Sequence, residues 1–178
     1  FPVAIATWKS FPAIVAGNTF LWKPATETPM MAYEMAKVFE EAGIPPGVAN
    51  VVFGSGSDVG TAMIEHPDVK VISFTGSTET GRSVAERGGR HLKKVSLEMG
   101  GKNAVIVMDD EDLGLAVEGI LWSAFGTAGQ RCTACSRVIV HKDVKEELES
   151  LLLTSMGQLT IGDGMDETVK IGPVINKK

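Results

Sequence analysis

Two side chains in this 178-residue sequence could carry out acyl chemistry together, the thiol of Cys132 and the carboxylate of Glu98. Cys132 follows a glycine-rich approach, residues 125–129, in which the backbone can come close to a ligand. Glu98 ends an apolar stretch and precedes Gly100-Gly101, so its carboxylate can face a cleft. Because a thiol can attack a carbonyl carbon and a carboxylate can then activate water, the pair predicts nucleophilic catalysis. The plainer alternatives are a buried, inert cysteine and a solvated carboxylate at the end of a strand.

The composition indicates a globular protein and excludes several other classes. Hydrophobic residues make up 44% of the chain, enough for a buried core, and the net charge of −5 argues against binding to nucleic acid or to an anionic membrane. Cys132 and Cys135 are the two cysteines, and the three histidines have no ligand-like spacing, so no metal site is expected. No apolar run is long enough to span a bilayer, and a cytoplasmic location is expected. The ends of the sequence are typical of a piece of a larger protein.

Short apolar runs alternate with helical patterns, which is typical of an α/β fold with a parallel sheet built from βαβ units. Strands are expected at residues 19–22, 48–53, 69–74, 95–97 and 104–108. Longer helices are expected from Pro29, capped by Thr28 and ended by Gly43, and over residues 112–125 and 144–156. A domain boundary is best placed at Gly100-Gly101.

Two successive strands end in glycine-rich turns that lead into helices, at residues 54–60 and 75–81. Such turns aim backbone N–H groups and the positive end of a helix at an anion, commonly a phosphate. Neither has the G-x-G-x-x-G spacing, and each alone is as well explained by a tight turn. The two together favour a nucleotide-binding domain.

A phosphate-loop hydrolase is a competing interpretation. Residues 76–83 nearly match G-x-x-x-x-G-K-[ST], and the strand that ends at Asp109-Asp110 resembles a magnesium-binding strand end. Arg82 stands where the motif has a lysine, and this reading gives Glu98 and Cys132 no role. A catalytically silent nucleotide-binding module is a further alternative.

Several motifs in register resemble the aldehyde dehydrogenase superfamily over essentially the whole chain. They are Phe1-Pro2, residues 6–9, 17–19, 22–25, 74–78, 97–102 and 129–132. The Gln-Arg-Cys-Thr form of the last motif resembles the branch that oxidises semialdehydes. The resemblance implies a Rossmann-like cofactor-binding domain at residues 1–100, lacking its N-terminal part, and the start of an α/β catalytic domain at residues 101–178.

The resemblance also implies roles for individual residues. Cys132 matches the nucleophile, Glu98 the general base, and Lys9 a lysine linked to proton transfer, although a lysine on a helix is more often a surface group. The residues matched to the binding of NAD or NADP are Lys23, Thr26, Gly56, Gly60, Phe74, Gly76, Ser77 and Met99.

The implied reaction proceeds through a thiohemiacetal and a thioester on Cys132, which water activated by Glu98 hydrolyses to a carboxylate. This role favours a partly buried Glu98. NAD-preferring members carry a carboxylate three residues after the ribose-binding lysine. Thr26 occupies that position here, so use of NADP is expected.

The expected partners are a small aldehyde and, for the parent protein, further copies of itself. The family's oxyanion-stabilising Asn would precede Phe1, so the 178 residues alone are expected to show little turnover. Arg131, beside the nucleophile, has two interpretations, a group that attracts an anionic substrate and a member of a structural ion pair.

Overall fold

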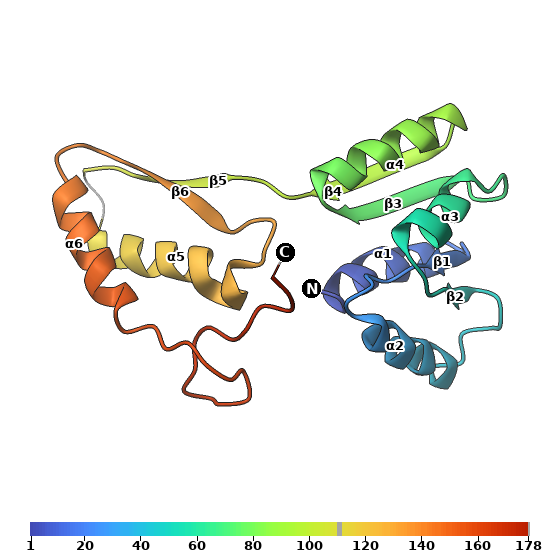
Figure 1. The fold of residues 1–178 in the computed structure, drawn as a ribbon, viewed down its shortest axis with the longest axis horizontal. Coiled ribbons are helices and arrows are strands. Elements are labelled where there is room, and N and C mark those ends of the chain that lie inside the picture. Colours follow the sequence, from blue (N-terminus) through green and yellow to red (C-terminus); the bar gives the residue numbers. More distant parts are fainter. Residues whose placement is uncertain (110–111, 178) are drawn as a thin grey trace. The chain divides into compact units, whose positions relative to one another are not determined.

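The computed structural model describes residues 1–109 and 112–177, which form an α/β fold of parallel strand pairs (Figure 1). The chain divides into two compact units, Phe1–Met99 and a second beginning at Gly100. Three successive βαβ segments make up most of it, and in each the two strands pair directly with each other. The assignment of cofactor binding to the first unit and of catalysis to the second stays a prediction.

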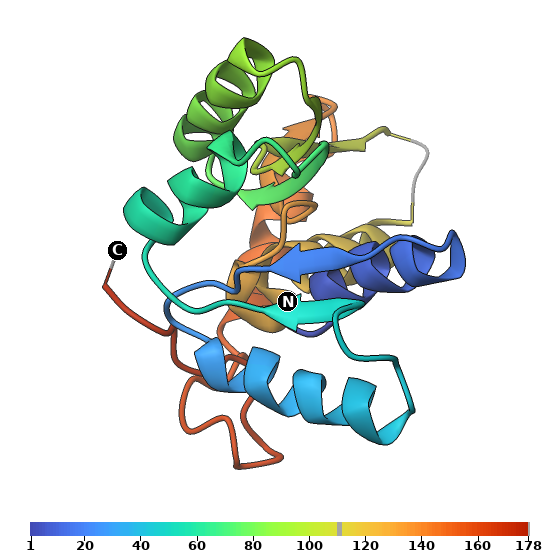
Figure 2. The ribbon, with the colours of Figure 1, turned by 90° about the vertical axis from the view of Figure 1, so that its right-hand side faces the viewer.

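The first segment comprises β1 (Phe20–Trp22), α2 (Pro29–Glu41) and β2 (Ala49–Val51), preceded by α1 (Ala4–Val15). Figure 2 shows β1 and β2 side by side. Phe39 of α2 is buried and makes edge-to-face contacts with Phe11 of α1 and Phe20 of β1, at centroid distances of 6.2 and 6.0 Å. Such aromatic pairs add to the free energy gained from burial alone. Phe39 therefore joins three elements of this unit.

Helix α2 begins at Pro29, as predicted, and Gly43 ends it, as predicted, but the N-terminal cap differs from the expectation. Thr28 is the N-cap residue, yet its side chain makes no capping hydrogen bond, which corrects the expected role. Gly43 adopts a left-handed φ of 77°, and the amides of Gly43 and Ile44 donate to the carbonyls of Glu40 and Phe39. This pattern ends a helix by satisfying its last carbonyl groups, and glycine adopts the required φ without strain.

The second segment comprises β3 (Val71–Gly76), α4 (Thr78–Arg90) and β4 (Lys94–Met99). A π-helical turn, η1 (Gly56–Gly60), and a short helix, α3 (Thr61–Glu65), connect it to β2. Side chains of β4 alternate along the strand, so that Val95, Leu97 and Met99 are half-buried while Ser96 and Glu98 are exposed. The buried face of the strand pair packs against α4, which buries Gly81, Val84 and Gly88.

The third segment comprises β5 (Asn103–Val107), α5 (Leu113–Phe125), a 3₁₀ turn η2 (Gly126–Gly129) and β6 (Cys135–Val140), followed by α6 (Lys145–Met156). Val107, Val117, Ile120 and Leu148 form the core of this unit. The side chain of Asp112 caps α5 by accepting hydrogen bonds from the amides of residues 114 and 115.

Two elements lie outside the expectations from sequence. Strand β6 was missed because its first half, Cys135-Ser136-Arg137, is mostly polar and lies beside an irregularity in the β5–β6 register. Helix α1 contains Pro12, which is usually a helix-breaking signal. No helix in the described part of the chain is both long and apolar enough to cross a membrane.

Adjacent glycines of α4 give a matched test of its packing. A Cβ atom at Gly88 would lie 2.6 Å from Cγ2 of Val95, whereas one at Gly89 would meet nothing within 4 Å. We expect Gly88→Ala to lower the free energy of unfolding by about 1–3 kcal/mol through overpacking. Gly89→Ala should raise it by about 0.5–1 kcal/mol, because alanine loses less backbone entropy in a helix. Urea unfolding of both variants makes the comparison, and equal effects would contradict the packing.

Candidate active site

Glu98 lies near the end of β4, paired with Thr75 of β3, on the strand face that points away from α4. Its side chain is exposed, which corrects the expectation of partial burial. The alternation of the strand explains this, because the neighbouring Leu97 and Met99 take the two positions that face α4. Within this unit the carboxylate is therefore accessible to a reacting group or to water.

Lys9 lies on α1, close enough to Glu98 for an electrostatic interaction between the two side chains. Burial lowers the pKa of the Lys9 amine below its ordinary value, because the charged form loses solvation. The negative charge of Glu98 opposes this effect by raising the pKa, without cancelling it. A half-buried lysine with a lowered pKa beside a carboxylate is able to exchange protons, which a solvated surface lysine does less readily near neutral pH.

Cys132 lies in the turn between η2 and β6, in the second unit, and its side chain is exposed. The loop that leads to it has an unusual backbone. Thr127 and Ala128 have φ values of 54° and 53°, and Gly129 follows with 68°. Such a conformation costs roughly 1–2 kcal/mol for each non-glycine residue, so surrounding contacts must maintain it.

Arg131 supplies such contacts. Its Nη2 donates to the carbonyl of Trp122 at 2.5 Å and to that of Ser123 at 3.4 Å, and its guanidinium lies 4.0 Å from the ring centroid of Trp122. A cation is favourable at this end of α5, where the carbonyl of Trp122 also accepts from the amide of Gly126. The structure thus gives Arg131 a structural role through carbonyl groups, not through the ion pair that was one of the two interpretations.

Asn103, at the start of β5, holds the other side of Cys132. Its Nδ2 donates to the carbonyl of Cys132 at 2.7 Å and to that of Ala134 at 3.3 Å. The β5–β6 register is irregular at this point, with Asn103 paired to Cys135 and Ala104 to Arg137. Sequence reasoning missed Asn103, because nothing local indicates a hydrogen bond to a residue 29 positions away.

The first glycine-rich turn lies beside Lys23. The Nζ atom of Lys23 donates to the carbonyl of Pro24 at 2.6 Å and approaches that of Gly54 at 3.5 Å. A Cβ added at Gly60 would lie 3.9 Å from Cδ and Cε of Lys23. The start of η1 is already occupied by protein groups, because Ser55 Oγ accepts from the amide of Asp58 and donates to its carboxylate. This carboxylate would repel a phosphate. The binding of an anion at this turn stays a prediction.

A serine caps the second turn in the same way as the first. Ser77 is the N-cap, and its Oγ accepts from the amide of Thr80 at 3.2 Å. Gly76 packs tightly under Phe74, since an added Cβ would lie 2.5 Å from Cζ of that ring, and a Cβ at Gly81 would lie 2.5 Å from Sδ of Met99. The predicted cofactor residues Phe74, Gly76, Ser77 and Met99 are therefore brought together, at a thirteen-residue helix whose N-terminus suits a phosphate.

Other predicted residues have simpler surroundings. Thr26 and Gly56 are exposed, and no atom within 4 Å would obstruct a Cβ at Gly56. The structure shows both next to solvent, and the carbonyl of Gly56 accepts from the amide of Thr61 at the end of η1.

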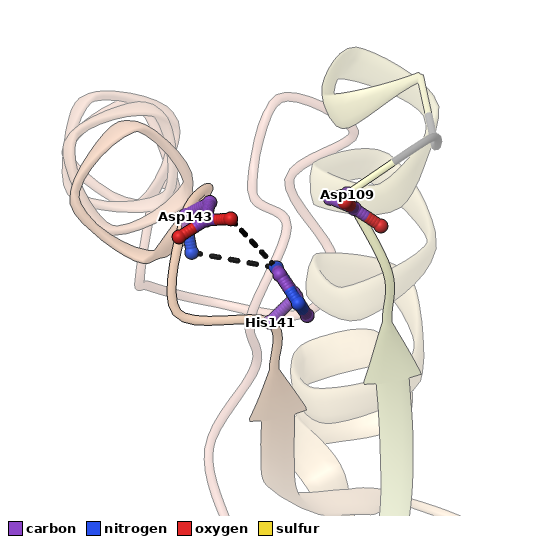
Figure 3. Close-up of side chains that lie close together, drawn as sticks. All are labelled: Asp109, His141 and Asp143. Carbon is purple, nitrogen blue, oxygen red and sulfur yellow. Dashed lines mark hydrogen bonds and ion pairs between the residues drawn. The ribbon is translucent and has the colours of Figure 1, made fainter.

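Asp109, His141 and Asp143 form a cluster that histidine spacing could not reveal (Figure 3). Each offers one ligand atom, and these atoms lie within 4.8 Å of one another. Nδ1 of His141 accepts from the amide of Asp143 at 3.4 Å and lies 3.7 Å from its carboxylate. Both aspartates are exposed, and the contacts of the imidazole are those of a loop-stabilising pair. These side chains have the chemistry of metal ligands, but solvent-facing groups of this kind are common without a metal.

The model of the aldehyde dehydrogenase family matches residues 1–178. The chain belongs to this family. It is 47% identical, over 99% of its length, to an alpha-ketoglutaric semialdehyde dehydrogenase of Bacillus subtilis (strain 168), and spans 36% of that relative. The solved structure of an E. coli NADP dependent enzyme is 46% identical in sequence to this chain and superimposes on it with a TM-score of 0.95. The match covers 98% of this chain and 36% of that one. The structure of a Pseudomonas syringae aldehyde dehydrogenase in complex with NAD⁺ and octanal shares 39% identity, with a TM-score of 0.96 and 36% covered.

Membership of the aldehyde dehydrogenase family confirms the resemblance and the Rossmann-like α/β fold. It does not favour the phosphate-loop alternative, which the geometry also opposes. Strand β3 extends to Gly76 and α4 begins at Thr78, so Arg82 lies inside the helix and no long phosphate-binding loop remains. Asp110, part of that alternative, lies outside the described residues.

The interaction between Lys9 and Glu98 predicts a titration shift. In Glu98→Gln the negative charge that raises the pKa of Lys9 is removed while burial remains, so this pKa should fall further and the titration midpoint should move to lower pH. The lysine amines can be methylated reductively with ¹³C-formaldehyde, and the NMR signal of Lys9, followed against pH, gives its titration midpoint. Lys37, whose pKa is raised by its hydrogen bond with Glu34, is the internal control and should not move. An unchanged or higher Lys9 midpoint would contradict the interaction.

Proposed function

We propose that the full-length protein is an NAD(P)-dependent aldehyde dehydrogenase that oxidises a semialdehyde to the corresponding carboxylate. The observation that carries this proposal is the exposed Cys132 on a strained loop, held by Arg131 and Asn103, in a chain of the aldehyde dehydrogenase family. The semialdehyde class is supported by the Bacillus relative. A cytoplasmic location and a homo-oligomeric parent protein belong to the same proposal.

The residues of this chain divide the reaction between them. The thiolate of Cys132 adds to the aldehyde carbon and forms a thiohemiacetal oxyanion; when the C=O bond re-forms, that carbon loses a hydride and the adduct becomes a thioester. A bound nicotinamide dinucleotide supplies the hydride acceptor. Glu98 then takes a proton from water, which attacks the thioester carbon, releasing the carboxylate product and the Cys132 thiol. Lys9, with its lowered pKa, passes protons between Glu98 and solvent.

We assign the predicted cofactor residues to parts of the dinucleotide from the chemistry of the two glycine-rich turns, residues 54–60 and 75–81. The N-terminus of α4, with Gly76 and Ser77, suits the pyrophosphate, and Phe74 and Met99 line the adjacent path. Lys23, Thr26, Gly56 and Gly60 hold the adenosine end. The 178 residues alone are proposed to turn over little, since they span 36% of the length of their relatives.

Substitution of the two proposed catalytic residues should separate the oxidation of the aldehyde to the thioester from the hydrolysis of the thioester. In the full-length protein, Cys132→Ser should lower kcat by on the order of a thousandfold or more, because the nucleophile is lost. Glu98→Gln should lower steady-state kcat by roughly 10²–10⁴-fold and leave a rapid burst of about one NAD(P)H per site, because only hydrolysis of the thioester is slowed. Stopped-flow absorbance measures both phases.

Cys135→Ser is the matched control, since this half-buried thiol donates to the carbonyl of Arg137 and has no role in the proposal. It should keep kcat within severalfold. Aldehyde-dependent turnover that survives in Cys132→Ser would refute the proposed nucleophile. Cofactor binding with no aldehyde turnover in the wild type would instead favour a catalytically silent nucleotide-binding module.

Thr26 provides a test of cofactor choice. Because position 26 carries no carboxylate to repel a 2′-phosphate, the protein should use NADP, and Thr26→Glu should lower kcat/KM for NADP at least about tenfold relative to NAD. Glu27→Gln, at the neighbouring position, should change the ratio little. A strong preference of the wild type for NAD would refute the proposed use of NADP. The NADP dependence of the E. coli neighbour supports it.

A further inference from the structure

The loop before Cys132 doubles back on the end of α5. The amide of Gln130 donates to the carbonyl of Thr127 at 3.1 Å, and a Cβ at Gly129 would lie 2.8 Å from the carbonyl oxygen of Ala124. Together with the left-handed residues 127–129, this leaves the loop little freedom to shift along the helix. The direction in which the loop leaves α5 therefore determines where the thiol of the following turn points.

Arg131 fixes that direction from the residue next to the thiol. Its Nη2 reaches back to the carbonyls of Trp122 and Ser123, and its guanidinium stacks on the ring of Trp122. A Cβ at Gly126 would lie 2.9 Å from the same Nη2, so the side chain fills the inside of the loop. The guanidinium thus contacts the helix end, the turn and an aromatic face at once, which a lysine amine cannot do.

Asn103 anchors the backbone on the far side of the thiol to β5 through the carbonyls of Cys132 and Ala134. The segment that carries Cys132 is consequently attached at both ends to rigid elements, α5 through Arg131 and β5 through Asn103. This arrangement lies wholly within the second unit.

We propose that Arg131 is a positioning residue, which orients the thiol of Cys132 through the loop and does not act by binding an anionic substrate. The inference rests on the proposed function only in taking Cys132 as the nucleophile. Positioning affects the reaction of the thiol with every electrophile, whereas a contact with substrate affects only aldehydes that carry a negative charge.

The test compares Arg131→Met, Arg131→Lys and Arg90→Met in the full-length protein. Arg90 is an exposed arginine paired with Glu86 on α4 and serves as the control. For each variant we would measure kcat and KM with succinate semialdehyde and with octanal. The rate of Cys132 alkylation by iodoacetamide against pH, with the site of labelling located by mass spectrometry, gives a readout independent of dehydrogenase activity. The midpoint of thermal unfolding would also be measured for each variant.

We expect Arg131→Met to lower kcat at least tenfold for both aldehydes alike, to change KM less than threefold, and to alter the rate and pH profile of Cys132 alkylation. Arg131→Lys should recover only part of the loss, and Arg90→Met should match the wild type. If Arg131→Met does not fold, Trp122→Leu removes the stacking surface while retaining Arg131, and should shift the alkylation profile in the same direction.

Two results would overturn the proposal. A rise in KM for succinate semialdehyde alone, with kcat and alkylation unchanged, would identify Arg131 as a substrate ligand. A lower thermal midpoint with an unchanged alkylation profile would reduce it to a stabilising side chain. If the wild type oxidises no aldehyde, the proposed function fails, whereas the alkylation profile still decides the role of Arg131.

Discussion

The arrangement of strands and helices depends on the burial of one face of the β3–β4 and β5–β6 strand pairs against helices. Val84 and Gly88 of α4 cover the β3–β4 pair, and Val117, Ile120 and Leu148 of α5 and α6 cover β5–β6. Since the helix that connects two parallel strands must cross back over them, the glycine-rich turns and the Asp109 cluster follow the carboxyl ends of their strands. The packing thus determines which short segments are available for chemistry.

The alternation of side chains along β4 explains why Glu98 is accessible. A side chain that points away from α4 on β4 is followed by one that points toward it, so the packing of Leu97 and Met99 directs Glu98 to the opposite face, toward the amine of Lys9. The lowered pKa of Lys9 is a consequence of this arrangement, because the desolvation of the amine outweighs the attraction of the carboxylate. Both properties follow from the packing of helices on the strands.

The second unit places its thiol by a different means. Helix α5 ends at Phe125 and β6 begins at Cys135, and the connection contains two left-handed non-glycine residues. Hydrogen bonds from Arg131 to α5 and from Asn103 to the Cys132 turn compensate for this backbone strain. Strain retained beside an exposed cysteine is a feature of functional sites, where a defined orientation is worth a local loss of stability.

The sequence by itself determined the α/β class, most strands and helices, and the identity of the candidate nucleophile and base. These depend on local information, namely the period of apolar residues, turn-forming glycines and contiguous motifs such as Gly129-Gln130-Arg131-Cys132. It missed β6 and α1, because the polar start of β6 and Pro12 in α1 contradict the local rules. Only the tertiary structure showed that Asp58 already occupies the first turn, that Lys9 is desolvated near Glu98, and that Asn103 and Arg131 hold the Cys132 loop. The physical reason is that burial, electrostatic interaction and most of these hydrogen bonds join residues distant in sequence, so that only the packing of strands and helices brings them together.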